Sequence, residues 1–293
     1  MKIRFYYLLS FLLLIGMAGA CTKPKEKKPL VTVTILPQQY FAEQIAGDKF
    51  EINTMVPRGS SPESFDPSPS SLQKVSDSRA YFMIGHIGFE LAWMKKLEEN
   101  NPELQVFDNS EGIDLLVDEH DCGHEGHNHA AHGSGVDPHT WTTPRNAAQI
   151  AANMLSAFIE LDPANEAYYR DNYNRLMDEI RATSDSLNML LSDLPSRDFA
   201  IYHPSLTYFA HDYGLRQFAI ENDGKEPSAL YLKALIDTVR HNGVKVIFIQ
   251  QEFDEKNARM LAGEVDGKVI AINPLSYEWS SELIEIAKAL NEK

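Results

Sequence analysis

Residues 162–195 have the sequence DPANEAYYRDNYNRLMDEIRATSDSLNMLLSDLP, which contains the longest uninterrupted helical pattern of the chain. Asp162-Pro163 places a capping carboxylate before a proline in the first turn, and no further Gly or Pro occurs until Pro195. This predicts one helix over residues 162–194. At about 1.5 Å per residue it is roughly 45 Å long, enough to join two lobes rigidly. Its apolar residues recur mainly at spacings of three, four and seven, which gives one apolar stripe: Tyr169, Tyr173, Leu176, Ile180, Leu187 and Leu191.

On both sides of this helix, strand-like and helix-like segments alternate, which predicts α/β lobes over residues 30–161 and 195–293 with mainly parallel sheets flanked by helices. The expected strands of the first lobe are residues 30–36, 50–56, 80–84 and 104–107, with helices at 38–46 and 88–99. The expected strands of the second are 199–202, 215–220, 244–249 and 269–272, with helices ending at Tyr213, at 228–241, at 255–265 and from 278.

The N-terminus has the pattern of an export signal. Lys2 and Arg4 precede an apolar run too short to span a membrane, and the small residues AGA precede Cys21. We expect residues 1–20 to be a lipoprotein signal peptide, Cys21 to be lipidated, and residues 21–29 to tether the protein to a bacterial membrane on its periplasmic or cell-surface side. The alternative is an ordinary signal peptide followed by an incidental cysteine.

The charge balance limits the class of partner. The chain has 42 Asp and Glu against 27 Lys and Arg, a formal net charge of −15. Nucleic-acid binding depends on clustered basic side chains, so this composition argues against it. An acidic surface favours cations instead.

Five of the ten histidines lie in an acidic, glycine-containing segment, residues 119–135, which cannot form a packed core. Neutral imidazole is the commonest ligand of zinc, so this segment predicts an accessory metal-binding loop. The alternatives are a solvated acidic linker or a purification tag; the interspersed Asp, Glu and Gly argue against a tag. Cys122 is a further possible thiolate ligand, and with Cys21 acylated it leaves no intramolecular disulfide. The five residues are His120, His124, His127, His129 and His132.

Two more histidines stand where strands deliver residues to a cleft. His139 belongs to DPHTW, residues 137–141, and His203 follows a predicted strand directly. In open parallel sheets the crevice beyond the carboxyl ends of the strands is the usual ligand site. Either histidine alone could be an ordinary hydrogen-bonded residue, but a pair with one member from each half predicts a shared site.

These residues belong to a set of motifs that resembles the zinc and manganese substrate-binding lipoproteins of bacterial ABC importers, the ZnuA-like group. The resemblance covers nearly the whole mature chain, and an acidic histidine-rich loop before DPHTW is typical of its zinc-specific members. The motifs are Val56-Pro57 with Ser61 to Pro67, Asp137 to Trp141, Tyr202-His203 with Tyr213-Gly214-Leu215, Lys225 to Ser228, and Ile272 to Leu275.

The resemblance implies two lobes joined by a rigid helix, with the metal held in the cleft between them. It assigns His139 and His203 as ligands. Glu63 stands where the family normally has histidine, and Asn273 where it often has aspartate. The fourth group is therefore left open between His86, Asn273 and water.

Ligand chemistry supports zinc at such a site. A Glu63 carboxylate oxygen can bind zinc at about 2.0–2.2 Å, whereas the neutral amide of Asn273 is a poor zinc ligand. Two imidazoles favour zinc over manganese, which prefers oxygen ligands. Glu226 and Gln251 are weaker candidates, because they also suit helix-start roles or roles that support the ligands.

The function that follows is capture of Zn²⁺ outside the cytoplasm and delivery to the membrane permease of an ABC importer, without catalysis. A zinc hydrolase would also use three protein ligands and an open water position, but the chain has no HExxH or GxSxG motif. A zinc-buffering or adhesin-type surface lipoprotein would have the same metal site without a permease partner.

Overall fold

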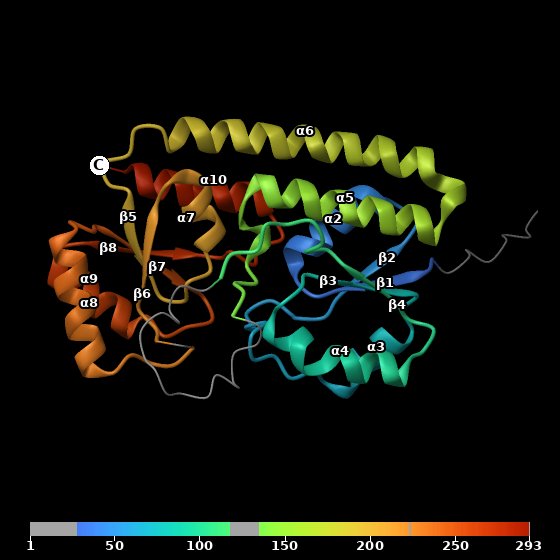
Figure 1. Ribbon diagram of the computed structural model, residues 1–293, viewed down its shortest axis with the longest axis horizontal. Coiled ribbons are helices and arrows are strands. Elements are labelled where there is room, and N and C mark those ends of the chain that lie inside the picture. Colours follow the sequence, from blue (N-terminus) through green and yellow to red (C-terminus); the bar gives the residue numbers. More distant parts are fainter. Residues whose placement is uncertain (1–27, 118–134, 223, 293) are drawn as a thin grey trace, which may run out of the picture.

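The computed structural model describes residues 28–117, 135–222 and 224–292, which form two α/β lobes side by side along the long axis of the molecule (Figure 1). The two-lobed architecture expected from the sequence, with a long joining helix, is confirmed. Within these residues, no helix is both long enough and apolar enough to cross a bilayer.

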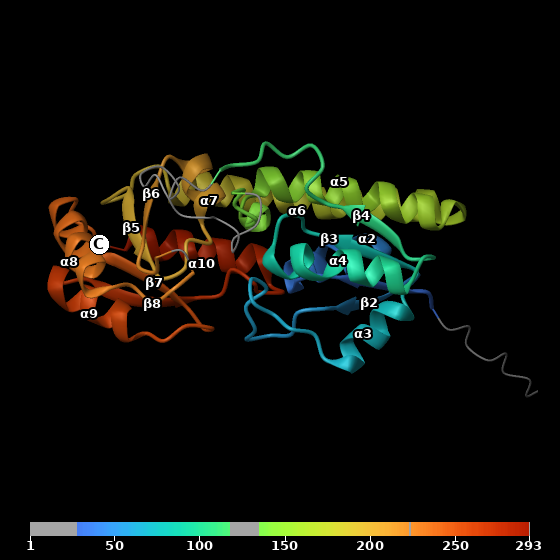
Figure 2. The same cartoon turned by 60° about the horizontal axis from the view of Figure 1, so that its bottom comes forward.

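The first lobe is built on four parallel strands in the order β2-β1-β3-β4. Tyr81 and Phe82 are neighbours on β3 and belong to separate hydrophobic clusters, as the alternation of side chains along a strand requires. Helices α2 and α5 cover one face, and α3 and α4 cover the other (Figures 1 and 2). The bounds are β1 Leu30–Val33, α2 Leu36–Ala46, β2 Glu51–Thr54, α3 Pro69–Ser76, β3 Ala80–Met83, α4 Gly88–Asn100, β4 Gln105–Asp108 and α5 Pro144–Leu161.

The second lobe repeats this plan with four parallel strands in the order β6-β5-β7-β8. Helices α7 and α10 contribute to the cluster on one face, and α8 and α9 to the cluster on the other. In both lobes the chain order reverses between the two central strands, the topology that opens a crevice at the strand ends. The bounds are β5 Asp198–Ile201, α7 Thr207–Tyr213, β6 Arg216–Ala219, α8 Ala229–His241, β7 Val246–Gln250, α9 Lys256–Val265, β8 Lys268–Ile272 and α10 Trp279–Asn291.

The long helix α6, Glu166–Leu190, has 25 residues and runs along both lobes beside α2, α5 and α10 (Figure 1). It is shorter than predicted, because Pro163–Asn165 forms a 3₁₀ turn and the chain leaves the helix after Leu190. Asp162 accepts hydrogen bonds from Asn165 and Tyr169 at this corner. The buried stripe recurs every three or four residues: Tyr169, Asn172, Leu176, Ile180, Thr183 and Leu187.

Most predicted strands and helices are found within a few residues of their expected ends. Helix α3 was not predicted, since it has only eight residues and Val75 alone among them is buried. Its start is fixed locally instead, because the Ser68 hydroxyl accepts the Ser71 backbone N–H at 3.2 Å and Pro69 follows the cap.

Two buried tryptophans, Trp141 and Trp279, connect the lobes through hydrogen bonds. Trp141 precedes α5, and its indole N–H donates to the carbonyl of Pro274 at 2.8 Å. Trp279 begins α10, and its indole N–H donates to the carbonyl of Trp141 at 2.7 Å. The Trp279 ring also packs edge-on against Phe41 of α2. These reciprocal contacts fix the second lobe against the segment that carries His139.

Candidate metal centre

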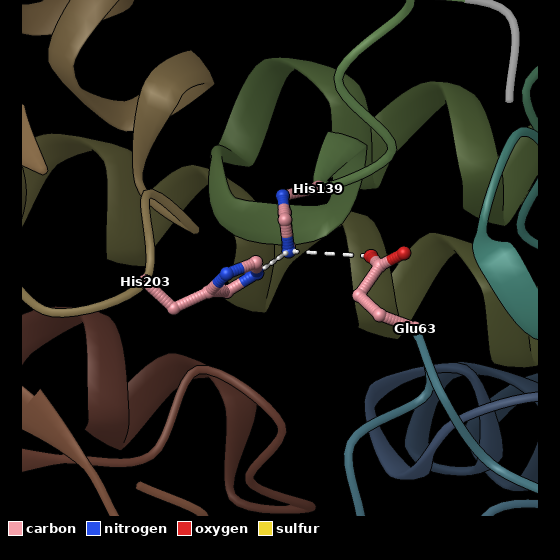
Figure 3. A group of neighbouring side chains, drawn as sticks. All are labelled: Glu63, His139 and His203. Carbon is pink, nitrogen blue, oxygen red and sulfur yellow. Dashed lines mark hydrogen bonds and ion pairs between the residues drawn. The ribbon is translucent and has the colours of Figure 1, made fainter. Parts of the chain in front are cut away.

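Glu63, His139 and His203 converge between the lobes (Figure 3). Glu63 lies in the loop between β2 and α3, His139 directly before the 3₁₀ turn Thr140–Thr142, and His203 two residues after β5. One ligand atom from each of the three lies within 4.8 Å of the others.

Each imidazole is oriented by a buried carboxylate. Nδ1 of His139 lies 2.9 Å from Oδ1 of Asp137, and Nδ1 of His203 lies 2.8 Å from Oε1 of Glu221. An ionised carboxylate only accepts hydrogen bonds, so each Nδ1 carries a proton and donates it. In a neutral ring Nε2 is then bare, and it is the atom that each histidine directs into the site.

The spacing of the two bare nitrogens fits a tetrahedral ion. His139 Nε2 and His203 Nε2 are 3.2 Å apart. Two ligands bound to zinc at about 2.0–2.1 Å in tetrahedral geometry are separated by roughly 3.3 Å. Oε1 of Glu63 lies 3.9 Å from His139 Nε2, so a small side-chain movement brings it to the same spacing.

The carboxylate of Glu63 is held on one side and free on the other. Its Oε2 accepts the Gly88 backbone N–H at 3.2 Å, whereas its Oε1 is buried and has no hydrogen-bond partner among the described residues. A buried oxygen without a partner is costly. A cation between Oε1 and the two Nε2 atoms would satisfy all three.

Charge in the site is more negative than the ligands alone suggest. Asp137 and Glu221 add two buried carboxylates to that of Glu63. Burial on its own would lower the pKa of His139, but the charge of Asp137 and its hydrogen bond outweigh burial, so the pKa is raised. Burial likewise opposes ionisation of Asp137, but His139 outweighs it and lowers the pKa of that carboxyl. The site therefore favours positive charge, whether proton or metal.

The three side chains line a cavity of about 30 Å³. The rings of Trp141 and Phe253 enclose it: Trp141 packs beside His139, and Phe253 stacks on His203 with ring centroids 5.5 Å apart. A space of this size holds an ion with one or two waters, since a water occupies about 10–15 Å³ on this measure.

Other residues proposed from the sequence lie elsewhere. His86 is outside the group of facing ligand atoms and occupies a left-handed backbone position, with φ 62°. Asn273 and Gln251 line a neighbouring cavity and not the one that Glu63, His139 and His203 line. Glu226 is exposed. Cys21 and Cys122 lie outside the described residues, as do the five histidines of the loop.

Two supporting residues were missed in the sequence analysis. Glu221 follows β6 by two residues, as His203 follows β5, and the paired register Ile201↔Ala219 brings them side by side. The amide of Gln250, at the end of β7, donates to the carbonyl of His203 at 2.6 Å and to the Ser205 hydroxyl at 2.8 Å. An acid directly after the predicted strand ending at residue 220 was the available signal for Glu221.

Removing the carboxylate behind His203 should weaken metal binding without removing a ligand. We expect Glu221→Ala to lower zinc affinity by about 10-fold, because the imidazole loses the acceptor that fixes its tautomer and orientation. Glu221→Gln should lose less, since an amide oxygen still accepts from Nδ1. Competition titration with zinc against a chelator of known affinity measures both, with the exposed Glu264→Gln as control. Equal affinities for Glu221→Ala and the control would contradict this role.

The turn behind Glu63 is held by a buried acid, Glu90. Its two oxygens accept the backbone N–H groups of Ile84 and Gly85, each at 2.8 Å, and it also accepts from the Thr34 hydroxyl. This turn leads into Gly88, where a Cβ would lie 2.3 Å from the carbonyl oxygen of Glu63, so only glycine permits the approach. Glu90 thereby supports the loop that presents Glu63.

Burial raises the pKa of Glu90 to about 7. The folded protein therefore keeps a proton that the unfolded chain releases near pH 4.5, so stability should fall as pH rises between these values and level off above 7. The slope from this group is at most about 1.4 kcal/mol per pH unit. We expect urea unfolding of the metal-free Glu90→Gln variant at pH 5, 6 and 8 to lack this decline; an identical pH dependence in both proteins would contradict the assignment.

Comparison with known proteins places the chain in a family. The sequence model of the family "ZnuA: Zinc-uptake complex component A periplasmic" matches residues 31–287. The crystal structure of a ZnuA is similar, with a TM-score of 0.82 and 35% identity, covering 89% of this chain and 97% of that one.

Two curated relatives show the same likeness. The high-affinity zinc uptake system protein ZnuA of Bacillus subtilis (strain 168) is 27% identical, covering 90% of this chain and 85% of that protein. The zinc-binding lipoprotein AdcA of Streptococcus pneumoniae serotype 4 is 26% identical over 87% of this chain, which spans about half (52%) of AdcA. Because the family pattern and the two-lobed fold both cover almost the entire described chain, this protein belongs to the ZnuA family of periplasmic zinc-uptake components.

Proposed function

We propose that this protein captures Zn²⁺ outside the cytoplasm and delivers it to the permease of an ABC importer, with Glu63, His139 and His203 as the metal ligands. The observation that carries the proposal is the pair of bare Nε2 atoms 3.2 Å apart beside the partnerless Oε1 of Glu63. The names of the relatives, which are zinc-uptake and zinc-binding proteins, support the same function.

Zinc is the favoured ion because two of the three ligands are imidazoles, whereas manganese prefers oxygen donors. His86 lies outside the group of facing ligand atoms, and Asn273 lines a neighbouring cavity and not the one that the three ligands line, so we assign water to the fourth position. One bound dication also offsets two of the three negative charges of Glu63, Asp137 and Glu221.

We further propose that Cys21 carries the lipid that holds the protein on the membrane, and that the histidine-rich loop binds additional zinc. The similarity to AdcA, which is named a zinc-binding lipoprotein, supports the lipid anchor. A ligand set with an open water position also suits hydrolysis, but membership of a transport-protein family favours transport.

The importer role can be tested in the source bacterium. A strain lacking this protein and any redundant importer should grow poorly under zinc limitation and recover with the wild-type chain. The His139→Ala/His203→Ala double variant, expressed at the same level, should not restore growth or uptake of ⁶⁵Zn. Normal uptake in the deletion strain, or full rescue by the double variant, would contradict the proposal.

A further inference from the structure

A second cavity of about 120 Å³ adjoins the metal pocket. It lies between the start of α2, the loop after β2 and the segments that follow β7 and β8. Glu252 and Leu275 line both cavities, so these two residues mark the boundary between them.

The two spaces differ in what they can hold. The outer cavity has room for several waters, whereas the inner one, at about 30 Å³, has room for an ion with one or two. A hydrated zinc ion therefore fits the outer cavity and must lose most of its water before it reaches the two histidines. A ligand at the boundary between the cavities would replace one of these waters before the site ligands replace the others.

Glu252 has the properties of such a donor. It is partly buried, and within the described part of the chain its carboxylate forms no hydrogen bond or ion pair. It lies outside the group formed by Glu63, His139 and His203, so reaching an ion held there requires a side-chain movement. Residues 251–254 belong to neither helix nor strand, and such a segment permits that movement.

We propose that Glu252 is a transient zinc ligand that passes the ion between the outer cavity and the three-residue site; this rests on the zinc-binding function proposed above. Its carboxylate oxygen replaces one water of the incoming ion, and the Nε2 atoms and Glu63 Oε1 then replace others. The reverse sequence releases the ion. Arg58, the other charged side chain of the outer cavity, does not line the inner one, so the boundary itself is negative and suits a cation.

A transient ligand affects both rates of exchange more than it affects affinity. We expect Glu252→Gln to slow zinc association and dissociation by about fivefold each, with the dissociation constant within about twofold of wild type, because a ligand used only during exchange lowers the same barrier in both directions. Glu252→Asp, which keeps the charge, should recover most of both rates. Glu98→Gln, an exposed change on α4, controls for net charge.

Stopped-flow mixing of the metal-free protein with ZnCl₂, followed by tryptophan fluorescence, gives the association rate, and a chromophoric chelator in excess gives dissociation. Rates unchanged in Glu252→Gln would overturn the proposal, as would faster dissociation with unchanged association, which identifies a permanent ligand. Failure of the wild type to bind zinc, or binding insensitive to His139→Ala and His203→Ala, would instead contradict the proposed function.

Discussion

His139→Ala or His203→Ala should each weaken zinc binding by at least about 100-fold. Four-ligand zinc sites release about 10–16 kcal/mol on binding, so one ligand accounts for about 3 kcal/mol, or two powers of ten. Each substitution also leaves a buried carboxylate without its imidazole partner, Asp137 in one case and Glu221 in the other. This second effect lowers the folding stability of the metal-free protein and is separate from the loss of the ligand.

Competition titration against a chelator of known affinity measures this loss, because direct calorimetry saturates for tight sites. His241→Ala, at the exposed end of α8, is the matched control and should bind like the wild type. Tight binding that survives in both site variants would show that the main zinc site lies elsewhere, for example in the histidine-rich loop.

Trp279→Ala should produce the largest loss of folding stability, about 3–5 kcal/mol, the usual range for removing a large buried aromatic side chain. Trp279 is 2% exposed, contacts Phe41 across the lobes and donates to the carbonyl of Trp141. Its removal leaves a cavity at the point where the lobes meet. Zinc affinity should fall as well, since Trp141 lies two residues from His139 and lines the metal pocket.

Chemical denaturation of the metal-free protein gives the stability difference. The comparison is Trp93→Ala: this tryptophan is only partly buried on α4, on the far face of the first sheet, and its loss should cost less and leave zinc affinity unchanged. Equal destabilisation by both substitutions would contradict the role of Trp279 in joining the lobes.

The ligands were predictable to different degrees. His203 could be proposed from its position after a predicted strand, because strand ends are recognisable locally, and His139 from its place in DPHTW at the end of the long polar loop. Glu63 lies in a loop without periodicity, and only the resemblance to a family indicated it. Glu221 was missed because its importance depends on which strand lies beside β5, and strand order is not encoded in local periodicity.

The fourth ligand position of the metal site could not be predicted from residue types alone. His86 and Asn273 were both reasonable by residue type, yet the structure places Asn273 on the outer cavity and leaves His86 outside the facing group. Glu252 was not predicted as a ligand, since a glutamate followed by a phenylalanine belongs to no recognised metal-binding motif. Its position on two cavities follows from the packing of both lobes.

Local patterns in the sequence are sufficient to predict the two α/β lobes, the long helix between them and the acidic, imidazole-based character of the site, because periodicity, capping and residue chemistry act over short distances. The tertiary structure was needed to show which carboxylate orients His203, how closely the two Nε2 atoms approach, and which residues separate the inner from the outer cavity. These features depend on strand order and on contacts between the lobes, such as the hydrogen bond from Trp279 to Trp141, which local periodicity does not encode.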